Sequence, residues 1–317
     1  MVNTKSVCPI FLVGAERSGT TLLRLMLDHH PDLAFNPEFE FAVDQIDNAG
    51  KIPNLSDYHY YLSSHGIFNS YNFTIDKNLS YEELINSFLL QKQQSDNKNL
   101  VGATVHHKFD HLLKFWKKSK YIHIVRDGRD VSISNIVMKW SGNLFIAANR
   151  WIDAENIWAE MEQKLAPEQK LTIYYEDLIR DSEKTLTTIC DFIGIPFSKE
   201  MYNYADDCTY SLPNTKFVTK WPKKLTDKEI QQIEYKIASL LKQHNYKLSG
   251  LPLQKPSNWF IMRMQIHDRI ARMLFRIQCY PLGLYIQDVI SRRLPFKSWR
   301  KKVKLKVWEY NKRFLKN

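Results

Sequence analysis

Two short stretches of this sequence combine glycine, arginine and hydroxyl side chains at a spacing that suits an anion. The first is "GAERSGTTLL", in which four residues separate Gly14 from Gly19. An apolar run precedes it, and an amphipathic segment follows from Thr20 onward. A strand, a tight glycine turn and a helix beginning near Thr20 would direct backbone N–H groups and a helix N-terminus at one point. The stretch therefore predicts a phosphate or sulfate site, although a turn without a ligand stays open at this point.

The positive charge of this loop comes from an arginine. In nucleotide-hydrolase loops a Lys follows the second Gly and reaches the terminal phosphates, and the next Ser or Thr holds magnesium. Here Thr20 occupies the lysine position, and the charge inside the turn is that of Arg17. We expect the anion to be held without a metal by Arg17, Ser18, Gly19, Thr20 and Thr21.

The second stretch, "YIHIVRDGRDVSISN", has the same architecture. An apolar strand leads into a sharp turn at Gly128 and then into a helical pattern. Arg126 leaves the carboxyl end of the strand, where parallel α/β sheets bind their ligands. Ser134 lies eight residues further on and can return to the same crevice. Two anion pockets on one sheet predict a single ligand that carries two separated anionic groups.

The elements that must position these loops are short buried strands alternating with helical patterns. Apolar runs predict strands at 10–13, 33–35, 100–105, 121–125 and 171–175. This alternation predicts an α/β fold of the P-loop type, with a parallel sheet flanked by helices.

Three helices are indicated by their own patterns. Segment 149–165 places its tryptophans and other apolar residues on one stripe, which predicts a core-facing helix. Ser80 with Glu83, and Thr226 with Glu229, fit the capping box that begins a helix. The polar run at 91–99 predicts a mobile loop.

Composition and charge divide the chain into two parts. The 317 residues are 44% apolar and 25% charged, as in ordinary globular proteins. The net charge of +11 is uneven, because residues 251–317 hold 16 lysines and arginines against three acids. We therefore predict an α/β domain at 1–250 and a basic, mainly helical extension at 251–317. The four cysteines form no C-x-x-C pair, so neither a zinc site nor a disulfide framework is indicated.

The sequence predicts a cytoplasmic protein. Residues 1–9 lack the apolar core of a signal peptide, and no run approaches the roughly 20 apolar residues that span a bilayer. The tail at 251–317 mixes aromatic residues with arginines and lysines. Three interpretations stay open for it: contact with an anionic membrane surface, an entrance for acidic acceptors, and a solvated basic face. No nucleic-acid partner is expected.

Three motifs resemble those of sulfotransferases that use 3'-phosphoadenosine 5'-phosphosulfate (PAPS). They are "RSGTTLL" at 17–23, "RDGRDVSIS" at 126–134 and "YEDL" at 175–178. Their order and spacing are similar to those of the bacterial and protein-tyrosine branch, over about residues 8–245. The resemblance does not cover the tail.

The resemblance implies roles for these residues. The first loop, at 17–21, would cradle the 5'-phosphosulfate, and Arg126 with Ser134 would hold the 3'-phosphate. Tyr175 and the pair Lys220 and Trp221 would complete the nucleotide site. A donor of this kind needs no magnesium, which accounts for the missing lysine.

Catalysis would then require charge stabilisation and a base. Arg17 would stabilise negative charge that grows on the leaving phosphate oxygen. Glu38 is the predicted general base, because it has the position of the catalytic Glu in the tyrosine-sulfating relatives. Pro37 biases the preceding residue toward an extended conformation, so the carboxylate leaves the end of a strand. Glu40 is the alternative base.

One departure from the family concerns a lysine. Many relatives carry it just before a Thr in the strand at 100–105, and this chain has none there. Two alternatives stay open: His106 or Lys108 compensates for the missing lysine, or the function is weakened or altered. His107 and His111 have the spacing of metal ligands on a helix, but no third ligand is evident, and we expect surface histidines.

The sequence therefore predicts sulfuryl transfer from PAPS to a hydroxyl or amine of an unidentified acceptor, which could be a small molecule, a glycan, a lipid or a peptide. A P-loop kinase is one alternative, disfavoured by Thr20 at the lysine position. A non-catalytic module that binds anions or membranes is the other. Residues 44–99 and the tail are expected to shape the acceptor pocket.

Overall fold

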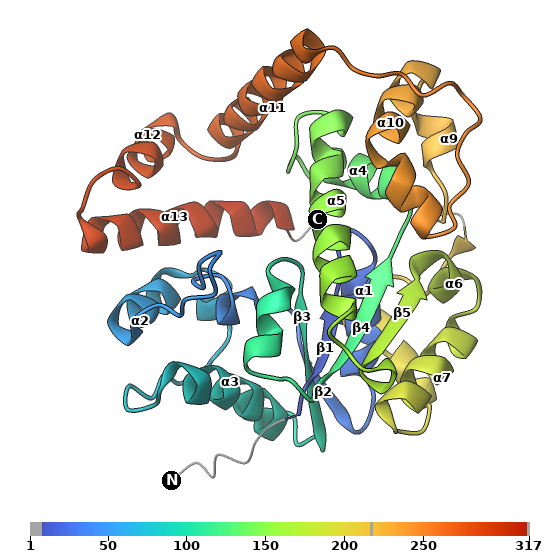
Figure 1. The fold of residues 1–317 in the computed structure, drawn as a ribbon. Coiled ribbons are helices and arrows are strands. Elements are labelled where there is room, and N and C mark those ends of the chain that lie inside the picture. Colours follow the sequence, from blue (N-terminus) through green and yellow to red (C-terminus); the bar gives the residue numbers. More distant parts are fainter. Residues whose placement is uncertain (1–7, 216–217, 316–317) are drawn as a thin grey trace.

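A sheet of five parallel strands lies at the centre of the molecule, with helices on both faces (Figure 1). The computed structural model describes residues 8–215 and 218–315. Most of the segment tested for a leader, 1–9, lies outside them, as do residues 316 and 317 of the tail. In the order β2-β3-β1-β4-β5 the strands are Leu33–Asn36, Leu100–Val105, Ile10–Val13, Lys120–Val125 and Lys170–Tyr174. The predicted parallel α/β fold is confirmed.

The central strand β1 contributes to a hydrophobic core on each face of the sheet. Phe11 and Val13 point to one core, and Ile10 and Leu12 point to the other. All four are buried, since neighbouring side chains of a strand point to opposite faces and both faces are covered. This double burial explains why the strand is an uninterrupted apolar run in the sequence.

The helices that cover the two faces also confirm most of the predicted starts. The capping boxes at Ser80 and Thr226 are both formed, and the stripe of the long central helix is buried. Tyr175 begins a helix and does not end a strand. Before the tail, the α-helices among the described residues are α1 Thr20–Asp28, α2 Leu55–Ser64, α3 Tyr81–Ser95, α4 Gly128–Val137, α5 Leu144–Glu162, α6 Tyr175–Arg180, α7 Ser182–Ile193, α8 Tyr204–Asp207, α9 Trp221–Lys224 and α10 Asp227–Gln243.

The prediction of a loop at 91–99 was wrong for its first half, because α3 continues to Ser95. Polar side chains in this last turn make specific contacts. Lys92 pairs with Asp28 at 3.3 Å and with Asp96 at 2.6 Å. Such surface pairs on a helix leave no apolar stripe to read in the sequence.

The tail is helical, as predicted, and forms an arch beside the α/β body (Figure 1). Its helices are α11 Asn258–Cys279, α12 Leu282–Ser291 and α13 Lys297–Leu315. They have a small core of their own, which includes Cys279, Leu284 and Val303. The domain boundary at residue 250 stays a prediction.

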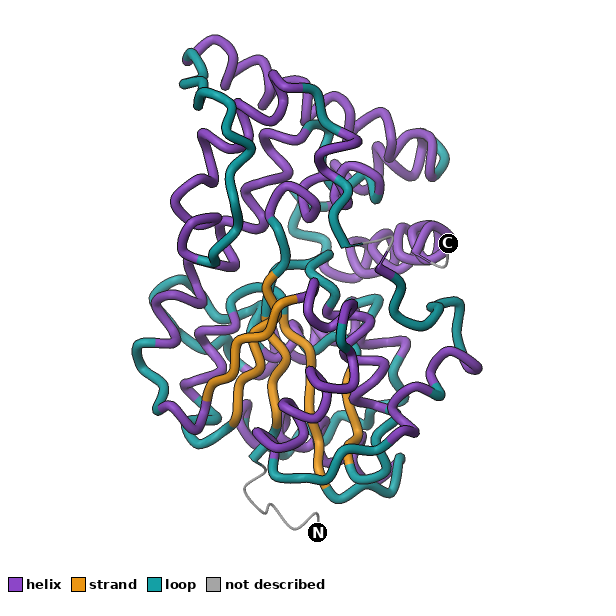
Figure 2. The backbone as a smooth tube through the Cα atoms, turned by 90° about the vertical axis from the view of Figure 1, so that its right-hand side faces the viewer, coloured by secondary structure: helices purple, strands orange, loops and turns teal. Residues whose placement is uncertain are grey.

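Figure 2 shows the strands at one end of the molecule and, at the other, helices joined by loops. None of the helices within 8–215 and 218–315 has both the length and the apolarity that crossing a bilayer requires.

Candidate active site

The loop between β1 and α1 has a shape that depends on glycine. Gly14 has φ 146°, Arg17 has φ 73° and Gly19 has φ 98°, so three residues of the turn have positive φ. The space beside Gly19 is filled by the Tyr175 ring, which a side chain at this position would strike. The nine-residue helix α1 begins directly after this turn, at Thr20, as the sequence predicts. Its free N–H groups therefore face the end of the sheet where β1 stops.

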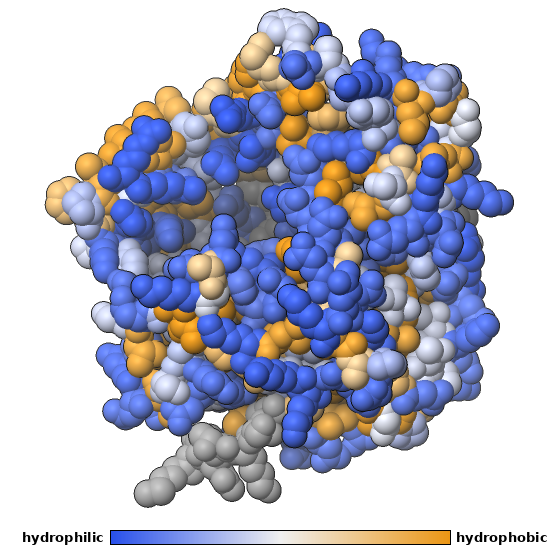
Figure 3. Space-filling view, in the orientation of Figure 1, coloured by the Kyte–Doolittle hydropathy of each residue, from blue (hydrophilic) through white to orange (hydrophobic). Residues whose placement is uncertain are grey.

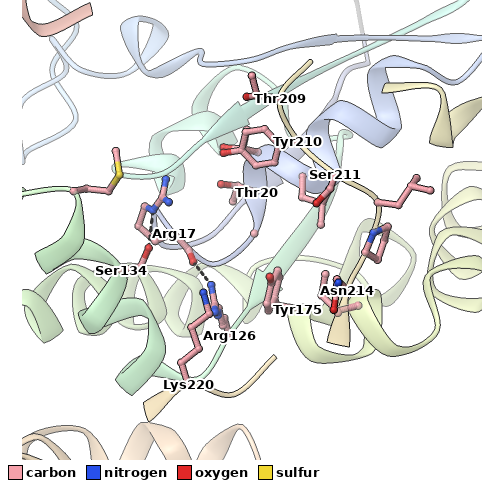
Figure 4. A pocket seen from close by; sticks show the side chains of 17 residues that line it. Arg17, Thr20, Arg126, Ser134, Tyr175, Thr209, Tyr210, Ser211, Asn214 and Lys220 are labelled. Atoms are coloured by element: carbon pink, nitrogen blue, oxygen red, sulfur yellow. Dashed lines mark hydrogen bonds between the residues drawn. The ribbon is translucent and has the colours of Figure 1, made fainter. Parts of the chain in front are cut away.

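The loop after β4 lies beside this turn, because β1 and β4 are neighbours in the sheet. An Nη atom of Arg126 donates a hydrogen bond to the Arg17 carbonyl oxygen over 3.2 Å. Arg17 Nε donates to Ser134 Oγ over 2.9 Å. The Arg126 guanidinium also stacks on the Tyr175 ring, 4.2 Å from its centre. Figure 4 shows these four side chains converging.

The two anion pockets expected from the sequence form one continuous cavity of about 440 Å³. Of the ten predicted nucleotide-binding residues, eight line it: Arg17, Gly19, Thr20, Thr21, Arg126, Ser134, Tyr175 and Lys220. Joining the pockets brings the charges of two arginines and a lysine to one wall (Figure 4). Such a wall attracts a strongly anionic ligand.

One wall of the cavity was missed by sequence reasoning. It consists of Thr209–Asn214, which follows α8 and supplies Tyr210 and Ser211. The segment has no glycine turn, no strand pattern and no charge cluster, so no signal in a single sequence marks it. Its position depends on the tertiary fold.

Two of the ten predicted nucleotide-binding residues, Ser18 and Trp221, do not line the cavity. Ser18 is fully buried, and its hydroxyl has no hydrogen-bond partner among the described residues. Trp221 lies against the Arg129 guanidinium, which is 3.8 Å from the ring centre. The Asp130 carboxylate accepts hydrogen bonds from the backbone N–H groups of Lys220 and Trp221, at 3.0 and 2.9 Å. Asp130 thereby fixes Lys220 at the rim of the cavity.

Arg129 has a structural role that the motif alone did not reveal: it forms buried ion pairs. It is buried and pairs with Asp127 at 2.6 Å and with Glu234 of α10 at 2.5 Å. It also donates to the Lys247 carbonyl oxygen over 3.0 Å. Arg129 therefore ties the second loop to α10, while Arg126, three residues earlier, faces the cavity.

Glu38 lies at the end of β2 in surroundings that raise its pKa. Burial, followed by repulsion from Glu40, raises the pKa of Glu38 to about 7, against the lowering influence of His106 and Arg24. Its backbone N–H donates to the Tyr71 hydroxyl over 3.1 Å. Arg24 is electrostatically coupled to Tyr71 and also to Tyr210, which lines the cavity. Glu38 is therefore a neighbour of the cavity but not part of its lining.

Glu40, His106 and Thr20 form a chain of hydrogen bonds that leads into the cavity. The ring nitrogens of His106 contact Glu40 Oε1 at 2.6 Å and Thr20 Oγ1 at 3.0 Å. Burial alone would lower the pKa of His106, but the Glu40 carboxylate raises it above the ordinary value. Burial would likewise raise the pKa of Glu40, and the contact with His106 lowers it instead. The Glu40 contact therefore favours the positively charged form of His106 beside the loop.

The other side chain expected to compensate for the missing lysine points elsewhere. Lys108 Nζ donates to the carbonyl oxygens of Asp44 and Ile46, at 3.1 and 2.7 Å. His107 pairs with Asp44 at 2.7 Å, and His111 contacts Asp110 at 3.9 Å. The two histidines therefore contact different carboxylates and are not arranged as a pair of metal ligands. Within the described ranges, no three His, Cys, Asp or Glu side chains gather closely enough to hold a metal ion.

A family model described as "Sulfotransferase family" matches residues 9–199, which is more than half of the chain and includes both loops and Glu38. The chain belongs to the sulfotransferase family.

Individual relatives of this sulfotransferase are distant. Protein-tyrosine sulfotransferase 1 of Danio rerio is 24% identical over 65% of this chain and 58% of its own length. The 3-beta-hydroxysteroid sulfotransferase of Cavia porcellus is 28% identical over 33% of this chain and 41% of its own. This chain therefore spans less than two thirds of either relative. The sulfotransferase domain of the Synechococcus PCC 7002 olefin synthase has the same fold, with a TM-score of 0.59, 21% identity, and coverage of 78% of this chain and 98% of that one.

Proposed function

We propose that this chain transfers a sulfuryl group from PAPS to a hydroxyl or amine of an acceptor, with Glu38 as the general base. The observation that carries the proposal is the meeting of Arg17 and Arg126 in one cavity. The two arginines leave neighbouring strand ends and face the same space. A nucleotide with phosphate groups at both ends of its ribose matches this distribution of charge.

The cavity fits such a donor in size and chemistry. Its volume, about 440 Å³, lies within the range of about 300–1,000 Å³ that small-molecule sites have. Hydroxyl groups of Thr20, Thr21 and Ser134 accompany the cationic groups.

The proposed reaction uses positioning and charge. The acceptor oxygen forms a bond to sulfur while the bond from sulfur to the leaving phosphate oxygen breaks, and the acceptor proton passes to the Glu38 carboxylate. Sulfuryl transfer resembles phosphoryl transfer, in which charge stabilisation dominates. Arg17 and the N–H groups at the start of α1 supply positive charge beside the leaving group, and His106 adds to it when it is protonated.

Donor binding is tested with two arginine variants. Isothermal titration with 3'-phosphoadenosine 5'-phosphate should show an affinity loss of about ten-fold or more in Arg17→Ala and in Arg126→Ala, because hydrogen bonds to charged groups contribute about 1.5–3 kcal/mol. Arg180→Ala is the matched control, since Arg180 is an exposed arginine of α6 that does not line the cavity. Wild-type affinity in either loop variant would count against the proposed site.

The base is tested with Glu38→Gln. Transfer of labelled sulfate should slow by about 10²- to 10⁴-fold, while 3'-phosphoadenosine 5'-phosphate binds with wild-type affinity. Glu183→Gln, an exposed change on α7, serves as the control. A wild-type rate in Glu38→Gln would remove this residue from the mechanism.

The acceptor is proposed only by class: a hydroxyl or amine carried by a small molecule, a glycan, a lipid or a peptide. The two relatives above are named for protein tyrosine and for a hydroxysteroid, so family membership does not select one. Tyr71, beside Glu38, belongs to the 44–99 region that we expect to shape the acceptor pocket. Mass spectrometry of acceptor mixtures after incubation with labelled donor would identify the class.

A further inference from the structure

The outer face of α11 is apolar although it is exposed. Its exposed large apolar side chains recur every three or four residues, which places them on one stripe of the helix. They are Trp259, Met262, Ile266, Ile270, Met273 and Leu274. Exposed apolar side chains gathered along one side of a helix indicate an interaction site.

The opposite face of α11 packs on the α/β body, so the stripe cannot also be in contact with it. Asp268 Oδ1 accepts from the backbone N–H of Gly142 over 2.7 Å, and Ala271 lies against the same glycine. Asn143 donates to the Met264 carbonyl oxygen over 2.8 Å. These contacts fix which side of α11 faces outward.

The next helix continues the apolar surface. Leu282, Ile286 and Ile290 of α12 are exposed at a spacing of four residues, and Leu294 and Phe296 are exposed directly after it. Figure 3 shows apolar and hydrophilic side chains intermixed along the upper left margin, over α11 and α12. The two helices together therefore present one outer rim, which we call the α11–α12 rim.

The exposed charge on this rim is positive. Each helix has a single acid, Asp268 or Asp288, and both are buried and paired with the arginine four residues further on, at 2.6 and 2.7 Å. Arg263, Arg269 and Arg276 are exposed on α11. The rim therefore offers apolar side chains and cations to solvent, and no carboxylate.

We propose that the α11–α12 rim binds the surface of an anionic membrane. A helix of 22 residues is about 33 Å long and can lie in the headgroup layer with its apolar stripe directed toward the acyl chains. The flanking arginines would then meet the lipid phosphates. A second copy of the rim carries the same positive charge and would be repelled, so self-association through this face is disfavoured.

The more basic helix, α13, is not the contacting element. It packs against the body through Trp308, which lies against Gly66, and through Lys297, which pairs with Asp57 at 2.8 Å. Val303 is buried in the core of the tail. The lysines of α13 add long-range attraction to an anionic surface, but its apolar residues are used within the fold.

Vesicle binding by the full chain tests the proposal without donor or acceptor, so its failure is distinguishable from failure of the proposed activity. The chain should sediment with vesicles of phosphatidylcholine and phosphatidylglycerol, and much less with phosphatidylcholine alone. Added salt should weaken the binding.

Two variants test the apolar and the cationic part separately. Ile266→Glu with Ile270→Glu should reduce vesicle affinity by about ten-fold or more. Tyr235→Glu on α10 is the control, because Tyr235 is 40% exposed and Ile266 48%. Arg269→Gln with Arg276→Gln should reduce affinity about five-fold per arginine, with Lys228→Gln as the control. Circular dichroism establishes that each variant is folded.

Three outcomes overturn the proposal. The first is absence of vesicle binding by the wild type. The second is equal loss in the rim variants and their controls. The third is a rim variant that changes the molecular mass in solution while vesicle affinity stays constant, which would assign the rim to a protein contact.

Discussion

At the scale of single residues, Glu38 and Glu40 show how surroundings give two neighbouring carboxylates opposite properties. Burial disfavours the charge of both. Glu40 contacts His106, which lowers the pKa of Glu40. The Glu38 carboxylate has no such contact among the described residues, and its pKa rises to about 7. A base works best when its pKa is near the working pH. Glu40 is therefore suited to position His106, and Glu38 is suited to accept a proton.

The pH dependence of transfer follows from these pKa shifts. The activity kcat/KM should fall as pH drops below about 7, because Glu38 must be deprotonated to act. His106 lowers the pKa of Glu38, so His106→Gln should move the acidic limb of the pH profile, where kcat/KM falls, to higher pH. A limb that stays in place, or moves to lower pH, would contradict the assignment of Glu38.

The same shift predicts a dependence of stability on pH. The folded-state pKa of Glu38, about 7, lies above the ordinary value of 4.5, so folding favours the protonated form. The stability gained from this proton is complete below pH 4.5 and is lost as pH rises through 7. Glu38→Gln should therefore be more stable than wild type at pH 8, by about 1–3 kcal/mol, with little difference at pH 4.5. Urea unfolding at both pH values measures this, and a destabilised variant at pH 8 would refute it.

At the scale of elements, the turn before α1 depends on a close approach between Gly19 and α6. The Tyr175 ring occupies the space that a side chain at Gly19 would need. The same ring also contacts the Arg126 guanidinium. The first loop, the second loop and α6 are therefore packed as one unit. A change in any of them is transmitted to the cavity.

Gly19→Ala should weaken binding of 3'-phosphoadenosine 5'-phosphate by about ten-fold, because strain of about 1–3 kcal/mol is added at the loop. Gly194→Ala is a close control, since Gly194 has φ 93° and Gly19 has φ 98°, and nothing lies within 4 Å of its side-chain position. Isothermal titration measures the loss of affinity, and thermal unfolding measures the loss of stability. Both variants should lose stability, but only Gly19→Ala should lose affinity.

Elements with a local cause were predictable from the sequence. The strands at 10–13 and 100–105 are apolar runs buried on both faces, and the capping boxes at Ser80 and Thr226 are short-range hydrogen bonds. The end of α3 was not predictable, because its last turn is stabilised by charge pairs and not by an apolar stripe.

Most of the site residues that belong to the two loop motifs were predictable from the sequence. Arg17 and Arg126 follow strands and reach the cavity as expected. Ser18 and Trp221 could not be placed, because their surroundings are set by the burial of the loop and by Arg129. The wall at 209–214 comes from a distant part of the chain and has no pattern of its own.

At the scale of the whole molecule, the tail runs from the α11–α12 rim back to the α/β body, where α13 packs near the candidate active site. While α11 and α12 face outward, α13 returns across α2 (Figure 1). The Tyr60 hydroxyl donates to the Lys297 carbonyl oxygen, and Lys304 is electrostatically coupled to His65. The tail thus borders the same 44–99 region that holds Tyr71 beside Glu38.

Gly66→Ala should release α13 from α2, since an added methyl would strike the Trp308 ring. Trypsin should then cleave the lysines of α13 faster than in wild type, because local opening exposes the backbone. Gly283→Ala in α12 is the control, as nothing lies within 4 Å of its side-chain position. Equal cleavage of the two variants would show that Trp308 does not hold α13 in place.

The central position of β1 affects the chain during its synthesis. β1 is made first, but its neighbours β3 and β4 end at Val105 and Val125. At ribosomal rates of about 5–20 residues per second, the strand waits on the order of ten seconds for its second partner. Phe11 and Leu12 face water throughout that interval, so a nascent chain halted before β4 should be a ligand for chaperones that capture apolar segments.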